Sequence, residues 1–213
     1  MYRHAAAAAF TGRRLQPKDR GTVKFLHDQW FPVRYPDHFF TLATSPDSAL
    51  QSEVLLHPET NEFAALAVWR QCSMAQVDVE DRDILPPAQH DGSRHDAIYI
   101  LTIGVAAEYR RCGLASRLIR NLIAHAEADR NPHCRCVYLH VLATNEGAIR
   151  FYTSHGFTRH ALLKNYYDIA GEKRDAYTYV YFLPPRSGQP ADWTDCVIQS
   201  YRDVCWNNAC AVM

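Results

Sequence analysis

A short run of cationic and small residues stands immediately ahead of a predicted helix. Its sequence is Arg-Arg-Cys-Gly-Leu-Ala, and it occupies residues 110–115. The first turn of a helix carries unpaired backbone N–H groups and the positive end of the helix dipole, so it can hold a phosphate. Gly113 lets the backbone approach the phosphate oxygens closely, and Ala115 is too small to block them. The run therefore predicts a phosphate-binding loop, although a basic surface turn between a strand and a helix has the same pattern.

Two residues that can move protons lie on apolar runs typical of buried strands. His140 interrupts residues 137–142, and Tyr99 stands near the beginning of residues 98–105. A polar ring in such surroundings needs a partner or a cavity. An imidazole with a pKa near ~6.5 suits a general base, whereas a tyrosine with a pKa near ~10 conducts a proton more readily than it removes one. Each residue is either catalytic or a core residue with an ordinary hydrogen bond.

The elements that carry these residues follow from hydrophobic spacing and turn residues. Their order is strand, two helices, three strands, helix, strand, helix and two strands. This order predicts an α/β sandwich with a mixed central sheet of about seven strands flanked by about four helices. Residues 164–167, Lys-Asn-Tyr-Tyr, are expected to connect the last hairpin. The predicted strands are residues 14–16, 52–56, 63–71, 98–105, 137–142, 157–163 and 177–182. The first predicted helix ends near Trp30, and the other three span residues 37–44, 114–129 and 145–154.

Two segments between these elements are expected to serve a substrate. Residues 31–36 contain two prolines that bar a continuous helix, so they form a loop that presents Phe31 and Tyr35. Aromatic rings on such a loop suit substrate contact, and covering of the core is the alternative. Residues 73–96 are polar and too long for a simple connector, and such segments are usually functional or disordered.

Composition argues against several classes of function. The 213 residues suit one domain with short extensions, and 23 basic residues balance 23 acidic ones, so nucleic-acid binding is not expected. The seven cysteines match no disulfide framework, and the spacing of His133, Cys134 and Cys136 differs from that of a structural zinc site, so no metal is expected. No run approaches the ~20 apolar residues needed to span a bilayer.

Two signatures resemble those of the GCN5-related N-acetyltransferase (GNAT) superfamily. Residues 110–115, Arg-x-x-Gly-x-Ala, are similar to its acyl-CoA pyrophosphate loop, and residues 145–157, Asn-x-x-Ala-x-x-Phe-Tyr-x-x-x-Gly-Phe, are similar to its second signature. The resemblance extends over residues 13–183 and implies a GNAT fold with acetyl-CoA as co-substrate. We expect these residues to form the acetyltransferase domain, preceded by a disordered leader at residues 1–12 and followed by a tail at residues 184–213.

A closer likeness is to the Golgi-associated N-terminal acetyltransferases of this superfamily. It implies that the chain acetylates the N-terminal amine of proteins, with methionine-starting, membrane-associated chains as substrates. The alternatives are a lysine or small-amine acetyltransferase of the same fold, and a CoA-binding module without turnover. The runs that carry the likeness are Trp-Phe-Pro at residues 30–32, Tyr-Pro at 35–36, Tyr-Ile-Leu at 99–101, Tyr-Leu-His-Val-Leu at 138–142 and Tyr-Tyr at 166–167.

The resemblance also implies roles for particular residues. Tyr99 and His140 are implied to be catalytic, and Arg34 reverses the charge of an acidic residue that is usual beside the peptide mouth. The residues implied to contact the substrate peptide are Phe31, Tyr35, Leu101 and Tyr167. The residues implied to bind acetyl-CoA are Ile103, Gly104, Val105, Arg111, Cys112, Gly113, Leu114, Ala115, Ser116, Asn145, Tyr152, Thr153, Ser154 and His155.

The tail has a pattern typical of membrane attachment. Its apolar residues recur at three- and four-residue spacing, which predicts an amphipathic helix. Residues 210–213, Cys-Ala-Val-Met, match the pattern for farnesylation of Cys210, for which chance is the alternative. We expect a peripheral enzyme on the cytosolic face of the Golgi or another endomembrane, with the cytoplasm as the alternative. The residues at helical spacing are Trp193, Val197, Tyr201, Val204 and Cys205.

Overall fold

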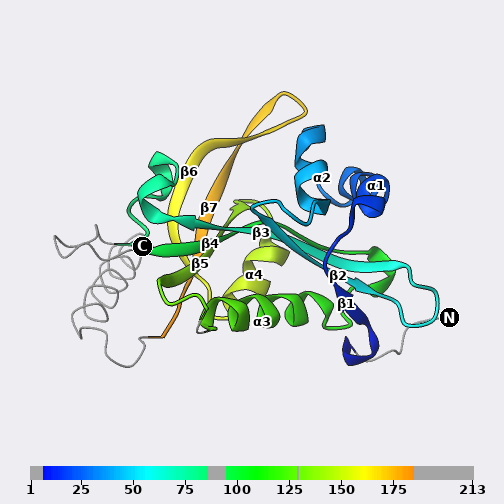
Figure 1. Cartoon of the computed structure of the whole chain (residues 1–213). Coiled ribbons are helices and arrows are strands. Elements are labelled where there is room, and N and C mark those ends of the chain that lie inside the picture. The colour runs from blue at the N-terminus through cyan, green and yellow to red at the C-terminus, as the bar shows by residue number, and fades with distance from the viewer. Residues whose placement is uncertain (1–6, 86–94, 129, 185–213) are drawn as a thin grey trace.

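The chain folds around one twisted, seven-stranded sheet. The computed structural model describes residues 7–85, 95–128 and 130–184, so the predicted tail helix and Cys210 lie outside the described residues. The strand order is β1-β2-β3-β4-β5-β7-β6 (Figure 1). The strands are β1 (Thr11–Arg13), β2 (Leu50–Leu56), β3 (Phe63–Ser73), β4 (Asp96–Val105), β5 (Cys134–Leu142), β6 (Thr158–Ile169) and β7 (Glu172–Phe182).

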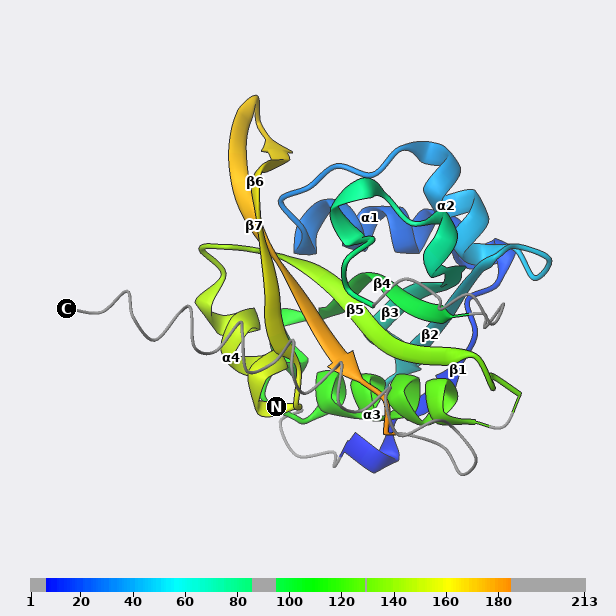
Figure 2. The ribbon, with the colours of Figure 1, turned by 90° about the vertical axis from the view of Figure 1, so that its left-hand side faces the viewer.

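Four α-helices cover the sheet in the described part of the chain, and their order along the chain confirms the predicted succession of elements. They are α1 (Arg20–Trp30), α2 (Asp37–Thr44), α3 (Leu114–Glu127) and α4 (Glu146–Ser154). Helices α1 and α2 lie on one face of the sheet, and α3 runs along the other (Figures 1 and 2). None of the described helices is both long and apolar enough to cross a bilayer.

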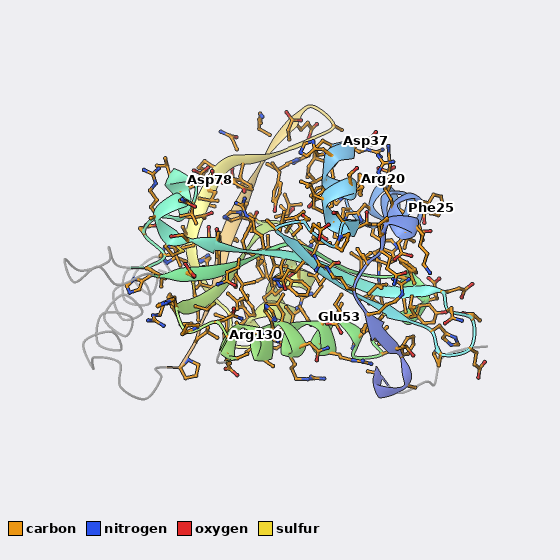
Figure 3. The ribbon with its side chains drawn as sticks, viewed as in Figure 1. Arg20, Phe25, Asp37, Glu53, Asp78 and Arg130 are labelled. Carbon is orange, nitrogen blue, oxygen red and sulfur yellow. The ribbon has the colours of Figure 1, made fainter. Side chains whose placement is uncertain are left out.

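Each face of the sheet buries its own apolar cluster. The face under α1 and α2 packs Val23, Phe39 and Phe40 against β2 and β3, and the opposite face packs Leu118 and Leu122 of α3 against the sheet. Side-chain hydrogen bonds at the edges of the apolar clusters also connect the helices to the sheet. Glu53 of β2, which is labelled in Figure 3, is one example: it accepts a hydrogen bond from the side chain of Asn121 on α3 at 2.8 Å. Residues 74–85 cover a third cluster around Tyr138, on the same face as α1 and α2.

The first strand begins earlier than the sequence indicated. The predicted strand was residues 14–16, but Thr11–Arg13 pairs with β2 instead. Phe10, which the sequence assigned to the leader, is buried at 3% exposure. The shift has a local cause, because Arg13 forms an ion pair with Asp19 at 2.6 Å and Pro17 begins a short turn. The packed fold therefore includes residues that precede residue 13.

The last hairpin differs from the prediction in the position of its turn. Residues 164–167 were expected to connect the two strands, but they lie inside β6, which continues to Ile169. The chain turns at Ala170 and Gly171, both of which have positive φ angles. Within β6 the register with β7 shifts between Leu163 and Tyr167. An irregularity of this kind keeps a strand in the sheet while it re-aims side chains, so the aromatic run stays attached to the fold.

Strands β4 and β5 are the parallel pair at the centre of the sheet, and they part midway. Their pairing ends at Ile100 opposite Leu139. On its other edge β4 pairs with β3, where Val68 opposes Thr102 and Trp69 opposes Ile100, so Leu101 is an extra residue. Such a bulge bends the strand that carries it. The bend makes room for a cavity between the diverging strands.

Candidate active site

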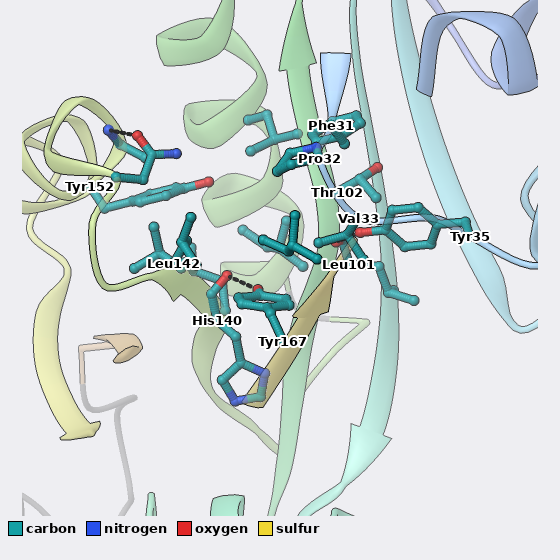
Figure 4. A pocket seen from close by; sticks show the side chains of 17 residues that line it. Phe31, Pro32, Val33, Tyr35, Leu101, Thr102, His140, Leu142, Tyr152 and Tyr167 are labelled. Atoms are coloured by element: carbon teal, nitrogen blue, oxygen red, sulfur yellow. Dashed lines mark hydrogen bonds between the residues drawn. The ribbon is translucent and has the colours of Figure 1, made fainter. Parts of the chain in front are cut away.

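A cavity of about 150 Å³ lies where β4 and β5 diverge (Figure 4). One wall comes from β4, the opposite wall from β5 and α4, and the rim from the loop after α1 and from β6. The described residues that line it are Phe31, Pro32, Val33, Tyr35, Ile100, Leu101, Thr102, Ile103, Leu139, His140, Val141, Leu142, Asn145, Ala148, Tyr152, Tyr167 and Ile169. All four predicted peptide-contacting residues, Phe31, Tyr35, Leu101 and Tyr167, are among them.

The backbone of His140 lines this cavity, whereas its imidazole ring points away from the cavity (Figure 4). The His140 carbonyl accepts a hydrogen bond from the Tyr167 hydroxyl at 3.0 Å. The imidazole is only 2% exposed, and its Nε2 lies 2.9 Å from Oδ1 of Asp81, whose side chain is 3% exposed. A carboxylate accepts hydrogen bonds, so Nε2 carries the proton in this pair and the neutral ring presents Nδ1 as an acceptor.

Two tyrosines converge on Nδ1 of His140. The Tyr166 hydroxyl donates to it at 2.7 Å, and the Tyr99 hydroxyl lies 3.1 Å from it. Tyr99 also forms a hydrogen bond with Tyr166. Burial raises the pKa of Tyr99 well above its usual value, with Tyr166 adding to the effect, so the hydroxyl stays protonated at neutral pH. Asp81, His140, Tyr166 and Tyr99 thus form one continuous chain of hydrogen-bonding groups beneath the cavity.

This chain of groups can conduct a proton. The imidazole of His140 has an acceptor nitrogen, Nδ1, and the two tyrosine hydroxyls stand next to it. Tyr99 is absent from the described cavity lining, and the imidazole is buried. A proton leaving an amine in the cavity must therefore cross a water molecule or a hydroxyl to reach His140. General bases act through one intervening water in this way.

The rim of the cavity is aromatic and apolar. Phe31, Pro32 and Val33 follow the end of α1, and the Tyr35 hydroxyl donates to the carbonyl of Leu101 at 3.2 Å. That bond ties the loop after α1 to the bulge of β4. Burial raises the pKa of Tyr35 to about 12, so its hydroxyl remains a donor at neutral pH. The sequence predicted a loop that presents aromatic rings here, and the structure confirms the loop and shows that it lies beside β4.

The N-terminus of α3 has the geometry that the predicted anion site requires. The helix begins at Leu114, after Gly113 with φ 79° and Arg111 with φ 66°. Among the described residues no side chain caps the first turn, and that turn contains no acidic residue. The Leu114 side chain is buried at 1% exposure and anchors the helix end in the core. The first-turn N–H groups thus remain available to a phosphate, with Arg111, Cys112, Ala115 and Ser116 beside them.

The last residues of β4 border the gap between β4 and β5, and an extended ligand can lie in this gap. Ile103 lines the cavity. Ala106 donates its N–H to the carbonyl of Ala64 on β3 at 2.9 Å. Since successive N–H groups of a strand point to opposite edges, those of Ile103 and Val105 point toward the gap beside β5. The N–H of Gly104 points to the opposite edge, toward β3, and a side chain at this position would face Trp30 and Phe31.

Helix α4 closes the other side of the cavity with only part of its predicted set. Asn145 caps the helix by accepting the N–H of Ala148 at 3.1 Å, and it also lines the cavity, as does the buried Tyr152. Thr153 and Ser154 are exposed and His155 is half-buried, and these three are absent from the described lining. They lie at the C-terminal end of α4, where the Ser154 hydroxyl donates to the carbonyl of Phe151.

Two residues of the site carried no assignment from sequence. Tyr166 was noticed only as part of an aromatic run, and its bulged strand brings its hydroxyl onto His140. Asp81 lies in the polar segment before β4, among several other acidic residues, and nothing in its local pattern separates it from them. Within the described residues, no group of three or more histidine, cysteine or acidic side chains is arranged to hold a metal.

Comparison with known protein families identifies the class of protein to which this fold and this cavity belong. The family described as Acetyltransferase (GNAT) family matches residues 23–157, and the chain belongs to that family. It is 38% identical over 192 residues to N-alpha-acetyltransferase 60 of Xenopus tropicalis, a span of 90% of this chain and 76% of that protein. It is 30% identical over 175 residues to histone acetyltransferase MCC1 of Arabidopsis thaliana, a span of 80% of this chain and 69% of that protein.

Solved structures agree with these relatives. The structure of Arabidopsis thaliana NAA60 in complex with acetyl-CoA matches with a TM-score of 0.73 and 29% identity, and the match covers 82% of this chain and 98% of that one. These similarities show that the chain is an N-terminal protein acetyltransferase that uses acetyl-CoA. The GNAT fold expected from the sequence is confirmed, with a seven-stranded sheet and four α-helices in the part of the chain that the structure describes.

Proposed function

We propose that the chain acetylates the α-amine of proteins that begin with methionine, and that it works on the cytosolic face of an endomembrane. The observation that carries the first part is the apolar rim of the cavity. Phe31, Pro32, Val33 and Ile169 line it without a charged side chain among them. A long apolar first residue gains affinity by leaving water at such a surface, whereas a charged one loses its solvation.

The protein must remove a proton from the amine, orient acetyl-CoA and stabilise charge on the thioester carbonyl oxygen. The neutral amine attacks the thioester carbonyl carbon, the carbon–sulfur bond breaks, and the amine proton must leave. An α-amine with a pKa of ~7.7–8.0 is already partly neutral at physiological pH, so its base needs to do less than a base for lysine, whose pKa is ~10.4. In the proposal His140 takes the proton through Tyr99, Tyr166 or a water, while Asp81 holds the imidazole in the accepting tautomer.

The remaining contributions come from orientation and from polarised groups. Acetyl-CoA supplies the activated acetyl group when it is bound. The first turn of α3, from Gly113 onward, would hold the pyrophosphate with its N–H groups and with Arg111. The backbone N–H groups of Ile103 and Val105 would orient the arm in the gap, and a donor of this kind also stabilises charge on a carbonyl oxygen. Asn145 and Tyr152 would close the opposite side.

A second candidate activity is acetylation of lysine side chains. Its specific support is the similarity to the Arabidopsis thaliana protein named histone acetyltransferase MCC1. A lysine side chain would have to pass the aromatic rim formed by Phe31, Tyr35 and Tyr167, and the rest of its peptide would remain outside. The apolar rim favours a free N-terminus with an apolar first side chain, so the α-amine is the preferred substrate.

Peptide kinetics distinguish these activities. The full-length chain is assayed with acetyl-CoA on matched peptides that begin with Met, Leu, Ser or Asp, and on an N-terminally blocked peptide that contains an internal lysine. We expect kcat/KM to be highest for the methionine-starting peptide, and at least about tenfold lower for the serine-starting one, the discrimination typical of an apolar pocket. Higher kcat/KM on the blocked lysine peptide would reject the proposal in favour of a lysine acetyltransferase.

The membrane location rests on the sequence of the tail, which lies outside the described residues. Its apolar spacing, with Trp193, Val197 and Tyr201 on one stripe, would bury one helix face in the bilayer interface. Fractionation of cells that express the full chain tests this, with a Trp193→Glu, Val197→Glu variant as the comparison. Loss of the membrane fraction in the variant supports the proposal, and a wild-type chain found wholly in the soluble fraction rejects it. Lipidation of Cys210 stays a prediction, and the intact mass of protein from its native host tests it.

A further inference from the structure

The end of α1 packs on β4 at a position where only a glycine fits. A Cβ atom built on Gly104 would lie 2.6 Å from Cε3 of Trp30 and 2.9 Å from Cζ of Phe31. Carbon atoms that are not bonded pack about 3.5–4.0 Å apart, so a methyl group here would overlap both rings. Phe31 also lines the cavity. Gly104 therefore contacts, from the strand side, one of the rings that bound the substrate space.

The backbone at the end of α1 cannot retreat to relieve such an overlap. His27, one turn before Phe31, is 1% exposed, and its Nδ1 donates to the Val23 carbonyl at 2.9 Å. Its Nε2 then accepts a hydrogen bond from the Thr102 hydroxyl of β4 at 3.2 Å. The rings of Phe39 and Phe40 pack on the His27 imidazole, with ring centres 5.5 Å and 5.3 Å away. Helix α1 is thus bonded to β4 two residues before Gly104.

The part of this contact that can move is the Phe31 ring. Cζ is the far end of a side chain with two rotatable bonds, whereas Trp30 is packed into both large apolar clusters of the core. The Phe31 N–H is held by the carbonyl of His27 at 3.0 Å, so the backbone of the loop start is fixed as well. A side chain added at position 104 would therefore press on the packed Trp30 ring and displace the Phe31 ring away from β4, and the Phe31 ring borders the cavity.

We propose that Gly104 is a specificity-determining residue of the reaction. By carrying no side chain it lets the Phe31 ring lie against β4, and the space left in front of the ring admits a long first side chain of the substrate. This inference rests on the proposed function, because it concerns the pocket for the first residue of a methionine-starting protein. It adds a second role to the acetyl-CoA contact expected of Gly104, since a side chain at this position would face Trp30 and Phe31.

The test is a pair of glycine-to-alanine variants in the full-length chain. Gly104→Ala is compared with Gly21→Ala, a control at a position on α1 where an added Cβ meets nothing within 4 Å. For each protein we measure kcat/KM on peptides that begin with Met and with Ser, the Kd of acetyl-CoA, and the melting temperature. We expect the Met-to-Ser ratio to fall about tenfold in Gly104→Ala, since about one methylene of pocket space is worth 10- to 200-fold. The ratio for Gly21→Ala should equal that of the wild type.

A rescue variant separates the pocket from a general disturbance. Phe31→Leu removes the Phe31 atom that meets position 104 and leaves the Trp30 contact in place, so in the Gly104→Ala background it should restore part of the Met-to-Ser ratio. A Gly104→Ala protein that melts as a folded chain and keeps the wild-type ratio would overturn the inference, as would a loss confined to acetyl-CoA affinity. A wild-type chain without preference for methionine would instead reject the proposed function, and the two failures are distinct.

Discussion

Nε2 of His140 and Oδ1 of Asp81 lie 2.9 Å apart although the two residues are separated by 59 positions in the chain. Both side chains are almost fully buried, so the pair is shielded from solvent competition. The carboxylate fixes which nitrogen of the ring carries its proton, and Nδ1 then faces the two tyrosine hydroxyls. Asp81 is therefore a positioning residue for His140.

Replacing Asp81 by asparagine should slow the reaction. The amide can offer its NH₂ group to Nε2, which favours the tautomer with the proton on Nδ1, and that nitrogen then no longer accepts. We expect kcat to fall by about 100-fold, within the range of a general base contribution, while the Kd of acetyl-CoA stays the same. Asp47→Asn is the control, because Asp47 is an exposed carboxylate between α2 and β2. An unchanged kcat in a folded Asp81→Asn protein would remove Asp81 from the mechanism.

Removal of the proton-conducting groups should lower turnover without loss of cofactor binding. His140→Ala deletes the acceptor, and Tyr99→Phe deletes only a hydroxyl that lies 3.1 Å from it. We expect about a 100-fold loss in kcat for the first and about tenfold for the second. Because burial raises the pKa of Tyr99 well above its usual value, the Tyr99→Phe profile of kcat against pH should keep the wild-type shape up to pH 10. Unchanged kcat in both variants would contradict both catalytic assignments.

Tyr166→Phe tests a residue that the sequence did not assign. Its hydroxyl lies 2.7 Å from Nδ1 of His140, closer than that of Tyr99. If the two hydroxyls belong to one path, the effects of Tyr166→Phe and Tyr99→Phe are not additive, and the double variant should resemble the more impaired single variant. Steady-state kinetics of the three proteins measure this. Strictly multiplicative losses would show that the two tyrosines act independently.

His27 should make the folded state sensitive to acid. Burial lowers its pKa from 6.5 to about 4, so between these values the unfolded chain binds a proton that the folded chain does not. The free energy of unfolding therefore decreases as the pH falls from 6.5 toward 4, by roughly 3 kcal/mol from this residue. Denaturant unfolding of wild type and His27→Gln at pH 7 and pH 4 measures the difference. Glutamine keeps an acceptor for Thr102 but does not titrate, and an equal acid loss in both proteins would contradict the assignment.

Arg34→Glu should change peptide selectivity by a small amount. Arg34 is 78% exposed in its side chain and forms an ion pair with Asp28 at 2.7 Å, so part of its charge is already compensated. Reversing it leaves two acidic groups beside the cavity rim. We expect kcat/KM to shift a few-fold toward peptides with a basic second or third residue, because exposed pairs are worth about 1 kcal/mol or less. The shift should weaken at 0.5 M salt, and an identical profile at low salt would rule it out.

The order and type of the elements were determined by sequence, because their signals are local. Residues 37–44 were predicted as a helix and form α2 with those bounds, since Pro36 precedes it and its apolar residues recur at helical spacing. The loop at Gly113 was predicted for the same reason, as a glycine before a helix is a local pattern. Two assignments were wrong. The first strand was placed at residues 14–16 but is Thr11–Arg13, and the aromatic run at residues 164–167 was taken for a turn but lies in a bulged strand.

Tertiary structure alone decided which residues meet in the site. In the sequence Asp81 is one of several acidic residues, and only the packing of the segment before β4 against β5 brings it to His140. Tyr166 reaches His140 through the register shift of β6. The contact of Gly104 with Trp30 depends on where α1 crosses β4. Contacts of this kind join residues far apart in the chain, and they are set by strand register and helix packing, which short-range patterns do not encode. Sequence therefore determined the fold and the chemistry of the family, and packing determined the partners of each proposed catalytic group.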